Sequence, residues 1–443
     1  MVFRNTKYCV FIAITLLWGG SNQLQAQATL LLEEPYSYDG TFAGTGHSAV
    51  YLSRVCAETP TELRRCRGGE TGVVISRYHH VGGRDWIAVP LMPYLYAVKD
   101  PGAIPLYVDA KLVQFLRNEY LRNNLADLAG ELGPKEPSNQ LAGSAYDRTL
   151  YAFRVATRPE QDDELIRILN SAPNAEAYRL LNRNCADFVK DIINFYYPHA
   201  THRSVVGDLG VTTPKQVAKS LVHSARRHPE MKLTVFVIPQ VPGLKRSKPV
   251  HGVIESVVLA KKYVTPVLLF HPLLVGGVEA AYWAGWRFDP TKNAMVFDST
   301  IFDSTISNST ISDPWHRRDP PLTKEQRRFY LESASSLKRD IRQEGVAGWK
   351  EFQASADPQL DAEGRPFLEA EWNGSAVQIG LSRENVFRLA APPELVQDML
   401  LTRIEQELKA KPARVSKRQV ESDWRLLEQA LDERKAELQE RTD

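Results

Sequence analysis

The sequence predicts an α+β protein, in which an antiparallel sheet packs against helices and a mainly helical region follows. β-branched and aromatic residues fill the runs 46–52, 72–78 and 85–91, which polar or glycine-containing loops join as in an antiparallel meander. Further strand-like runs at 148–157 and 232–240 alternate with stretches of helical period. These observations together indicate one sheet with helices inserted between its strands.

The helical patterns are clear in several places. They cover residues 109–132, 159–172 and 212–229, and Pro159 and Pro214 stand where the first turn of a helix accepts proline. Residues 323–443 form a charged region of amphipathic helices, with a β-hairpin at 366–381 that turns at Asn373-Gly374. We expect this region to be accessory and to carry contacts with a protein partner.

Composition excludes some classes of function. The chain has 443 residues, of which 43% are hydrophobic, and its formal net charge is +2. It is long enough for at least one large core. Because basic and acidic residues nearly balance, nothing favours a nucleic-acid partner.

The N-terminus has the pattern of a secretory signal peptide. Arg4 and Lys7 precede a short apolar run at 8–18, and a polar stretch ends in Ala26-Gln27-Ala28. The apolar run is too short to span a membrane. We therefore expect residues 1–28 to be removed, the mature chain to begin near Thr29, and the protein to be periplasmic or extracellular.

Export changes the interpretation of the cysteines. Cys56 and Cys66 flank a polar loop, and an oxidising compartment favours a disulfide between them. Their spacing does not suit a structural zinc knuckle, so no metal site and no cofactor is expected. Cys185 is left without a partner, which marks it as a candidate for reactivity.

Two segments separate the sheet region from the helical tail. Residues 241–290 contain the most apolar stretch of the mature chain, 264–286, which Pro266, His271 and Glu279 interrupt. It predicts a buried or membrane-contacting helical hairpin rather than a span, because charges at the bilayer centre are costly. Residues 291–322 include three pentads, FDSTI, FDSTI and SNSTI, and are interpreted as a polar linker.

Cys185 stands at the start of a predicted helix. Asn184 is a good N-cap and Asp187 lies three residues after it. Backbone N–H groups and the positive end of the helix dipole at this position should lower the pKa of the thiol. Val189 and Ile192 place Cys185 on an apolar face, so simple packing of a small buried cysteine is an equal alternative.

A cysteine nucleophile needs a histidine base and a group that orients it. His47 opens a strand directly after a glycine-rich turn. If Leu52 lies opposite Gly72 in a hairpin, His47 faces position 77, and Ser76, Tyr78 or His79 becomes the orienting group. His79 has the best chemistry for this role, with His80 as its competitor.

The motifs GTGHSAVYL and NRNCADFVKDII, in this order, resemble the circularly permuted branch of the NlpC/P60 papain-like superfamily. They are also similar to lecithin:retinol acyltransferase-like proteins and to the periplasmic domain of Lnb-type bacterial proteins. The resemblance covers residues 40–200 and implies a papain-like domain over 29–240. It implies a catalytic cysteine at Cys185, a histidine at His47 and a third polar residue near His79. The insert at 92–147 is longer than the family pattern, and no motif fixes the third residue.

The resulting hypothesis is a secreted thiol hydrolase or acyltransferase. Cys185 would attack an amide or ester carbonyl, His47 would move the proton, and His79 would hold the imidazole. Cell-envelope peptides or lipid-linked molecules would be its substrates, with membrane contact through 264–286. The alternative is an inactive papain-like module that serves as an envelope binding or scaffold protein.

Overall fold

The computed structural model describes residues 26–36, 44–78, 81, 83–126, 141–175, 178–259, 276–277, 288–297, 321–343, 352, 354–372, 374–383, 391–411 and 415–440. Four predicted features lie wholly or largely outside them. These are the signal peptide up to residue 25, the pair His79 and His80, the apolar segment 264–286 apart from 276–277, and the pentad repeat beyond Phe297.

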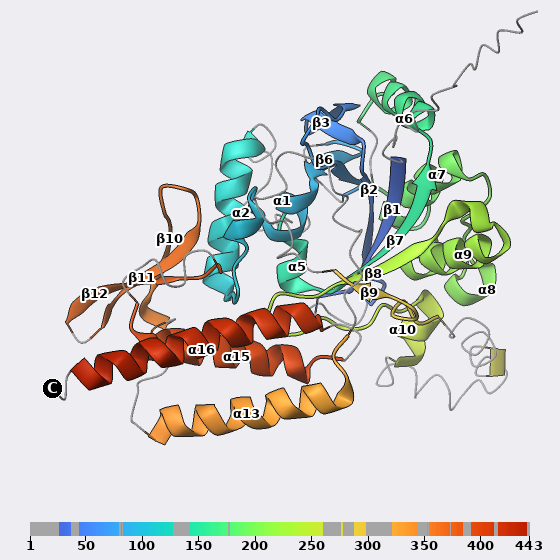
Figure 1. Cartoon of the computed structure of the whole chain (residues 1–443). Coiled ribbons are helices and arrows are strands. Elements are labelled where there is room, and N and C mark those ends of the chain that lie inside the picture. Colours follow the sequence, from blue (N-terminus) through green and yellow to red (C-terminus); the bar gives the residue numbers. More distant parts are fainter. Residues whose placement is uncertain are drawn as a thin grey trace, which may run out of the picture.

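A seven-stranded sheet forms the centre of the α+β fold (Figure 1). Its strand order is β6-β5-β2-β1-β7-β8-β9, and every neighbouring pair is antiparallel except the parallel pair β8–β9. The strands are β1 (Ala26–Glu33), β2 (His47–Leu52), β5 (Val73–Ser76), β6 (Ile87–Pro90), β7 (Leu150–Thr157), β8 (Thr234–Ile238) and β9 (Met295–Val296). The predicted meander is confirmed as β2, β5 and β6.

Both faces of this sheet are buried, and side chains alternate between two cores. In β2, Val50 and Leu52 enter one core, whereas Ala49 and Tyr51 enter the other. The alternation follows from the two-residue period of a strand. It therefore fixes which side chains at the end of β2 point toward which layer of helices.

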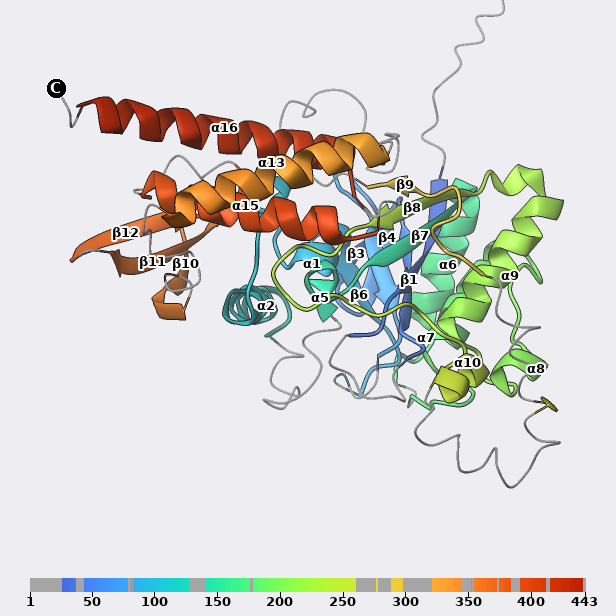
Figure 2. The same cartoon turned by 90° about the horizontal axis from the view of Figure 1, so that it is seen from below.

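Three helices cover one face (Figures 1 and 2). They are α6 (Pro159–Ser171), α7 (Cys185–Tyr196) and α9 (Pro214–Arg227), and the short elements α8 (Val205–Asp208), η3 (Pro229–Met231) and α10 (Val253–Leu259) follow or adjoin them. Pro159 and Pro214 occupy the first turns of α6 and α9, as predicted.

The other face carries the insert between β6 and β7 together with the C-terminal region. The insert forms α1 (Leu91–Tyr96), η2 (Pro101–Ala103), α2 (Ala110–Asn124) and α5 (Ser144–Asp147). The C-terminal region forms α13 (Lys324–Gln343), α15 (Pro393–Lys409), α16 (Lys417–Glu440) and a sheet of β10 (Asp357–Leu360), β11 (Pro366–Trp372) and β12 (Ser375–Gly380). The predicted hairpin is confirmed, since Trp372 pairs with Ser375 across the two-residue turn.

The insert and the C-terminal region share one core rather than forming separate bodies. The Leu106 N–H donates to the Leu381 carbonyl at 2.5 Å, and the Val108 N–H donates to the Pro242 carbonyl at 3.0 Å. The Gly243 N–H donates to Gln406 Oε1 at 2.8 Å. Segments far apart in sequence thus meet just before α2.

The polar loop between Cys56 and Cys66 is itself a small hairpin. It consists of β3 (Val55–Thr59) and β4 (Glu62–Arg65), and a disulfide joins Cys56 to Cys66, as predicted. Asn170 of α6 holds the hairpin by accepting from the Leu63 N–H and donating to its carbonyl.

The first strand begins earlier than the expected mature N-terminus. β1 starts at Ala26, and Ala28 already pairs with Leu52 of β2 and with Val155 of β7. The expected cleavage site after Ala28 therefore lies inside a central strand. The boundary at Thr29 stays a prediction. Among the described residues, no helix combines the length and apolarity needed to cross a membrane.

The register of β2 and β5 differs by one residue from the expected one. Leu52 pairs with Val73 rather than with Gly72. A Cβ at Gly72 would lie 1.9 Å from the Leu52 carbonyl oxygen, so the chain passes too close there for a side chain. Continuing the observed register places His47 opposite Tyr78, not opposite position 77.

Candidate functional site

Cys185 is the first residue of α7, and its helix begins as the sequence predicts. The Asn184 side chain accepts from the Asp187 N–H at 2.9 Å, and the Asp187 carboxylate accepts from the Asn184 N–H at 3.3 Å. The Asn184 amide also donates to the carbonyls of Leu180 at 2.8 Å and Thr212 at 3.0 Å. This capping box fixes the helix start and ties it to two loops.

The thiol itself is buried, and this reverses one expectation. Cys185 is 6% exposed and takes part in no disulfide. Burial raises the pKa of the thiol, although the adjacent Ser48 and the Ala186 N–H act to lower it. The predicted lowering of the thiol pKa at the helix terminus is therefore wrong for this arrangement, because desolvation of a thiolate outweighs the local N–H groups.

His47 is the first residue of β2, and a tight turn directly precedes it. Gly46 has a φ of +70°, and a Cβ at this position would lie 2.1 Å from the Glu33 carbonyl oxygen. Only glycine allows the turn to approach the end of β1 this closely. As a result His47 pairs with Glu33 at the end of the sheet.

Ser76 holds the imidazole of His47. Its Oγ lies 3.0 Å from His47 Nε2 and donates to the Ser48 carbonyl at 2.7 Å. Because the single hydroxyl proton is used on that carbonyl, Oγ accepts from Nε2–H, and Nδ1 is left as the nitrogen with a lone pair. Tyr78 stacks on the ring with a centroid separation of 5.4 Å.

The imidazole is neutral in this environment. Burial, followed by the charge of Arg148, lowers the pKa of His47 to about 3. Arg148 is itself buried and lies 3.2 Å from the Glu33 carboxylate. A second positive charge beside this guanidinium would be costly, so the imidazole stays unprotonated near neutral pH and is a weak base.

The sheet alternation separates the two candidate side chains. Ser48 and Arg77 face α7: Ser48 contacts Cys185, and the Arg77 guanidinium lies 5.2 Å from the Phe188 ring centroid. His47 and Ser76 project toward the other layer. The imidazole of His47 and the thiol of Cys185 thus lie on opposite faces of the sheet, and Ser48, the residue after His47, is the strand residue that contacts the thiol.

The group that orients the His47 imidazole is the part of the predicted site for which the sequence left several alternatives. His79 and His80 lie outside the described residues, so the role given to His79 stays a prediction. Ser76, one of the three alternatives from the sequence, makes the hydrogen bond to His47 Nε2. Tyr78, another alternative, supplies the stacked ring.

Sequence reasoning missed a cluster of charged and phenolic groups beside His47. Glu33 and Arg148 form a buried ion pair, Tyr94 donates to Glu33, and the Arg148 guanidinium lies 3.9 Å from the Tyr36 ring centroid. Burial raises the pKa of Glu33. The available signal was the run LLLEE at 30–34, where carboxylates directly follow an apolar stretch at the end of a strand.

One group of possible metal ligands occurs within the described ranges, formed by Cys56, Cys66 and Glu70. The two sulfurs are joined in the disulfide, so they offer no thiolate to a metal.

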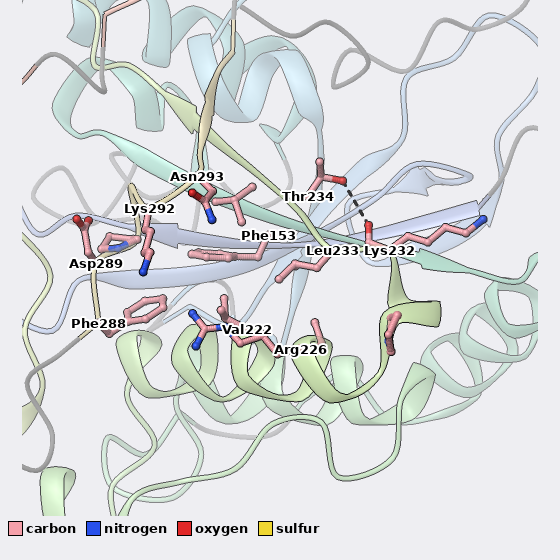
Figure 3. A pocket seen from close by; sticks show the side chains of 14 residues that line it. Phe153, Val222, Arg226, Lys232, Leu233, Thr234, Phe288, Asp289, Lys292 and Asn293 are labelled. Atoms are coloured by element: carbon pink, nitrogen blue, oxygen red, sulfur yellow. Dashed lines mark hydrogen bonds between the residues drawn. The ribbon is translucent and has the colours of Figure 1, made fainter. Parts of the chain in front are cut away.

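A surface pocket of about 1130 Å³ lies away from the candidate site (Figure 3). Phe153 and Phe288, whose ring centroids are 6.0 Å apart, form an apolar part of its lining, and Arg226 and Lys292 are among its charged lining residues. Cys185, His47 and Ser76 are not among its lining residues. The pocket therefore does not supply a substrate cleft for the thiol.

Comparisons of the chain with protein-family models, with curated proteins and with solved structures give no match. The resemblance to the permuted NlpC/P60 superfamily therefore rests on the two sequence motifs and stays a prediction.

Proposed function

We propose that the protein is an exported thiol hydrolase or acyltransferase of papain-like fold that acts on amide or ester bonds in the cell envelope. The observation that carries the proposal is the strand end of β2. There a histidine held by Ser76 directly precedes the serine that contacts a cysteine at a capped helix start. This pairing of a helix-start cysteine with a strand-start histidine is the arrangement that the two motifs imply.

The chemistry would use three groups. This chemistry requires His47 Nδ1 to come within hydrogen-bond distance of Cys185 Sγ from the other face of the sheet. His47 would then take the thiol proton as Sγ attacks the carbonyl carbon, and N–H groups of the first turn of α7 would stabilise the oxyanion. The C–N or C–O bond then breaks, and the leaving amine or alcohol takes the proton from His47. Water, or an acceptor amine or alcohol, finally cleaves the thioester. In this scheme Ser76 positions the imidazole, a role for which His79 also remains a candidate.

Thiol reactivity provides the test. The rate of alkylation of Cys185 by iodoacetamide should fall in His47→Ala, and Ser76→Ala should shift the pH dependence of that rate because the imidazole loses its fixed tautomer. Phe329→Ser, a surface change on α13, is the matched control. If Cys185 reacts no faster than the cysteine of the unfolded chain, and His47→Ala leaves the rate unchanged, the proposal fails.

A second candidate is supported by burial. Both side chains are less than one tenth exposed, the thiol pKa is raised and the imidazole pKa is lowered. These shifts oppose proton transfer from Cys185 to His47. They favour an inactive papain-like module that binds an envelope component, and the alkylation result that contradicts catalysis would support this alternative.

A further inference from the structure

Exposed aliphatic side chains gather at two loops beside the start of α7. Of the eight large hydrophobic residues that are exposed in the described part of the chain, five lie in these loops, with 61% to 74% of each residue exposed. They are Leu180, Leu181, Val205, Val206 and Leu209. We call these five residues the aliphatic patch.

The two loops meet at Asn184. Its side-chain amide donates to the Leu180 carbonyl and to the Thr212 carbonyl, so both loops lie against the same helix start. Leu180 and Leu181 belong to the first loop, and Thr212 follows the second loop by three residues. The segments that carry the five side chains are therefore both tied to the start of α7.

The second loop presents its apolar side chains outward while its polar groups are satisfied internally. The Gly207 N–H donates to Ser204 Oγ at 2.9 Å, and Thr213 Oγ1 donates to Asp208 at 3.0 Å. Asp208 also accepts from the Val253 N–H at 2.8 Å, which anchors the loop to α10. Leu209 has a φ of +53°, a conformation that is costly for leucine. The outward direction of these side chains is thus built into the loop.

Two exposed arginines adjoin the patch in sequence. Arg179 precedes Leu180, and Arg203, which lies 3.8 Å from the buried Asp187 carboxylate, precedes the second loop. The acid within the second loop, Asp208, is buried and hydrogen-bonded. Exposed aliphatic residues bordered by arginine match the two layers of an anionic lipid bilayer, its acyl chains and its phosphate headgroups.

Within the described part of the chain, the C-terminal helices lie away from the second loop. In Figures 1 and 2, α8 lies at the opposite side of the molecule from the C-terminal helices α13, α15 and α16. The helices that cover the other face of the sheet therefore do not reach the patch. Exposed apolar side chains that gather in this way indicate a surface that binds a protein or a membrane.

We propose that the aliphatic patch docks the protein on the surface of an anionic lipid bilayer, with the leucines and valines inserted between headgroups and with Arg179 and Arg203 on the phosphates. This places the start of α7 at the membrane surface. The proposal does not rest on the reactivity of Cys185, because the docking surface consists of other residues.

Sedimentation with lipid vesicles tests the proposal. The protein should bind vesicles of equal parts phosphatidylglycerol and phosphatidylcholine, and bind vesicles of phosphatidylcholine alone much more weakly. Leu180→Ser with Leu181→Ser should lower the partition coefficient at least about tenfold, given the transfer free energy of aliphatic side chains. Arg179→Gln should lower it about fivefold.

Two controls make the result specific. Ile168→Ser with Phe329→Ser removes two exposed hydrophobic residues elsewhere and should leave binding unchanged. Cys185→Ser should also bind as the parent does, which separates docking from catalysis. Fluorescence of Leu181→Trp should shift to shorter wavelength on anionic vesicles, a gain of signal that does not depend on loss of binding.

Three results would overturn the proposal. The first is equal binding to both kinds of vesicle, and the second is a Leu180/Leu181 variant that binds anionic vesicles as well as the parent. The third is self-association in sedimentation velocity that the same variant abolishes while vesicle binding is absent throughout, because the patch would then be an interface between two copies of the chain.

Discussion

Asn184 connects three parts of the chain through one side chain. It caps α7 and donates to the carbonyls of Leu180 and Thr212. The capping role was predictable, since an asparagine followed by an aspartate three residues later is a local signal. The two donated hydrogen bonds were not, because they depend on loops that only the tertiary fold brings together.

Asn184→Ala should lower the free energy of unfolding by about 3 kcal/mol, since it removes a cap and two donated hydrogen bonds. Asn184→Asp keeps the capping oxygen and should cost about half as much. Urea denaturation of the two variants measures the difference. Equal losses would show that the amide donations to the loops contribute nothing.

His47 should make stability depend on pH. Its pKa is lowered to about 3 in the folded protein, below the ordinary histidine value of about 6.5. Between these values the unfolded chain binds a proton that the folded chain does not. The free energy of unfolding should therefore decrease as the pH falls through this window.

His47→Gln removes this contribution, so the variant should lose less stability on acidification than the parent over the same window. Urea unfolding at a series of pH values measures both slopes. A His202→Gln variant, changed at an exposed histidine, should behave like the parent. Identical slopes for the parent and His47→Gln would show that His47 is not held neutral by burial.

The β3–β4 hairpin was predicted only in part. The spacing of its two cysteines and the expected oxidising compartment predicted its disulfide but not its strands. The disulfide followed from two cysteines ten residues apart in a chain expected to be exported. The strands between them were missed, because Glu62–Arg65 reads as polar and gains strand character from pairing with Val55–Thr59. Periodic helices such as α6 and α9 were predicted within a few residues, since one face of each packs on the sheet.

Replacing both Cys56 and Cys66 by serine should lower the free energy of unfolding by about 2–3 kcal/mol, the range for a loop of this length. Thermal unfolding of the oxidised protein, the reduced protein and the double variant measures this. Cys185→Ser should leave the effect of reductant unchanged. If reductant destabilises the double variant as much as the parent, the disulfide is not the source of the effect.

The central strand β1 was not assigned from sequence because its first residues also fit a cleavage site. Its run of apolar side chains is typical of a strand buried on both faces, but such a run after a signal-like stretch has two interpretations. Glu33 at its end likewise became part of a buried ion pair only through Arg148, which is more than one hundred residues away.

The C-terminal region and the insert share one core across the whole molecule. Leu400 of α15 is fully buried in the cluster that also contains Leu95 of α1 and Leu116 of α2. The sequence showed amphipathic helices there, but an amphipathic face does not reveal its partner. Residues after 322, which the sequence assigns to an accessory region, therefore pack in the same core as residues before 150.

Leu400→Ala should lower the free energy of unfolding by about 2–5 kcal/mol through the cavity that it leaves. Because the core is shared, the variant should also expose α2 to limited proteolysis at lower denaturant concentration than the parent. Leu438→Ala, at an exposed position near the end of α16, should have little effect. Protection of α2 that is unchanged in Leu400→Ala would indicate that the two regions unfold independently.

The central claim is that Cys185 and His47 act together on a carbonyl group. The most direct measurement is a burst experiment with a p-nitrophenyl ester, in which thiol attack breaks the ester C–O bond, releases nitrophenolate and leaves an acyl group on sulfur. We predict one nitrophenolate released per chain, with the acyl mass on Cys185, and a burst at least tenfold slower in His47→Ala. The absence of an acyl adduct on Cys185, or a burst of equal rate in His47→Ala, would contradict the claim.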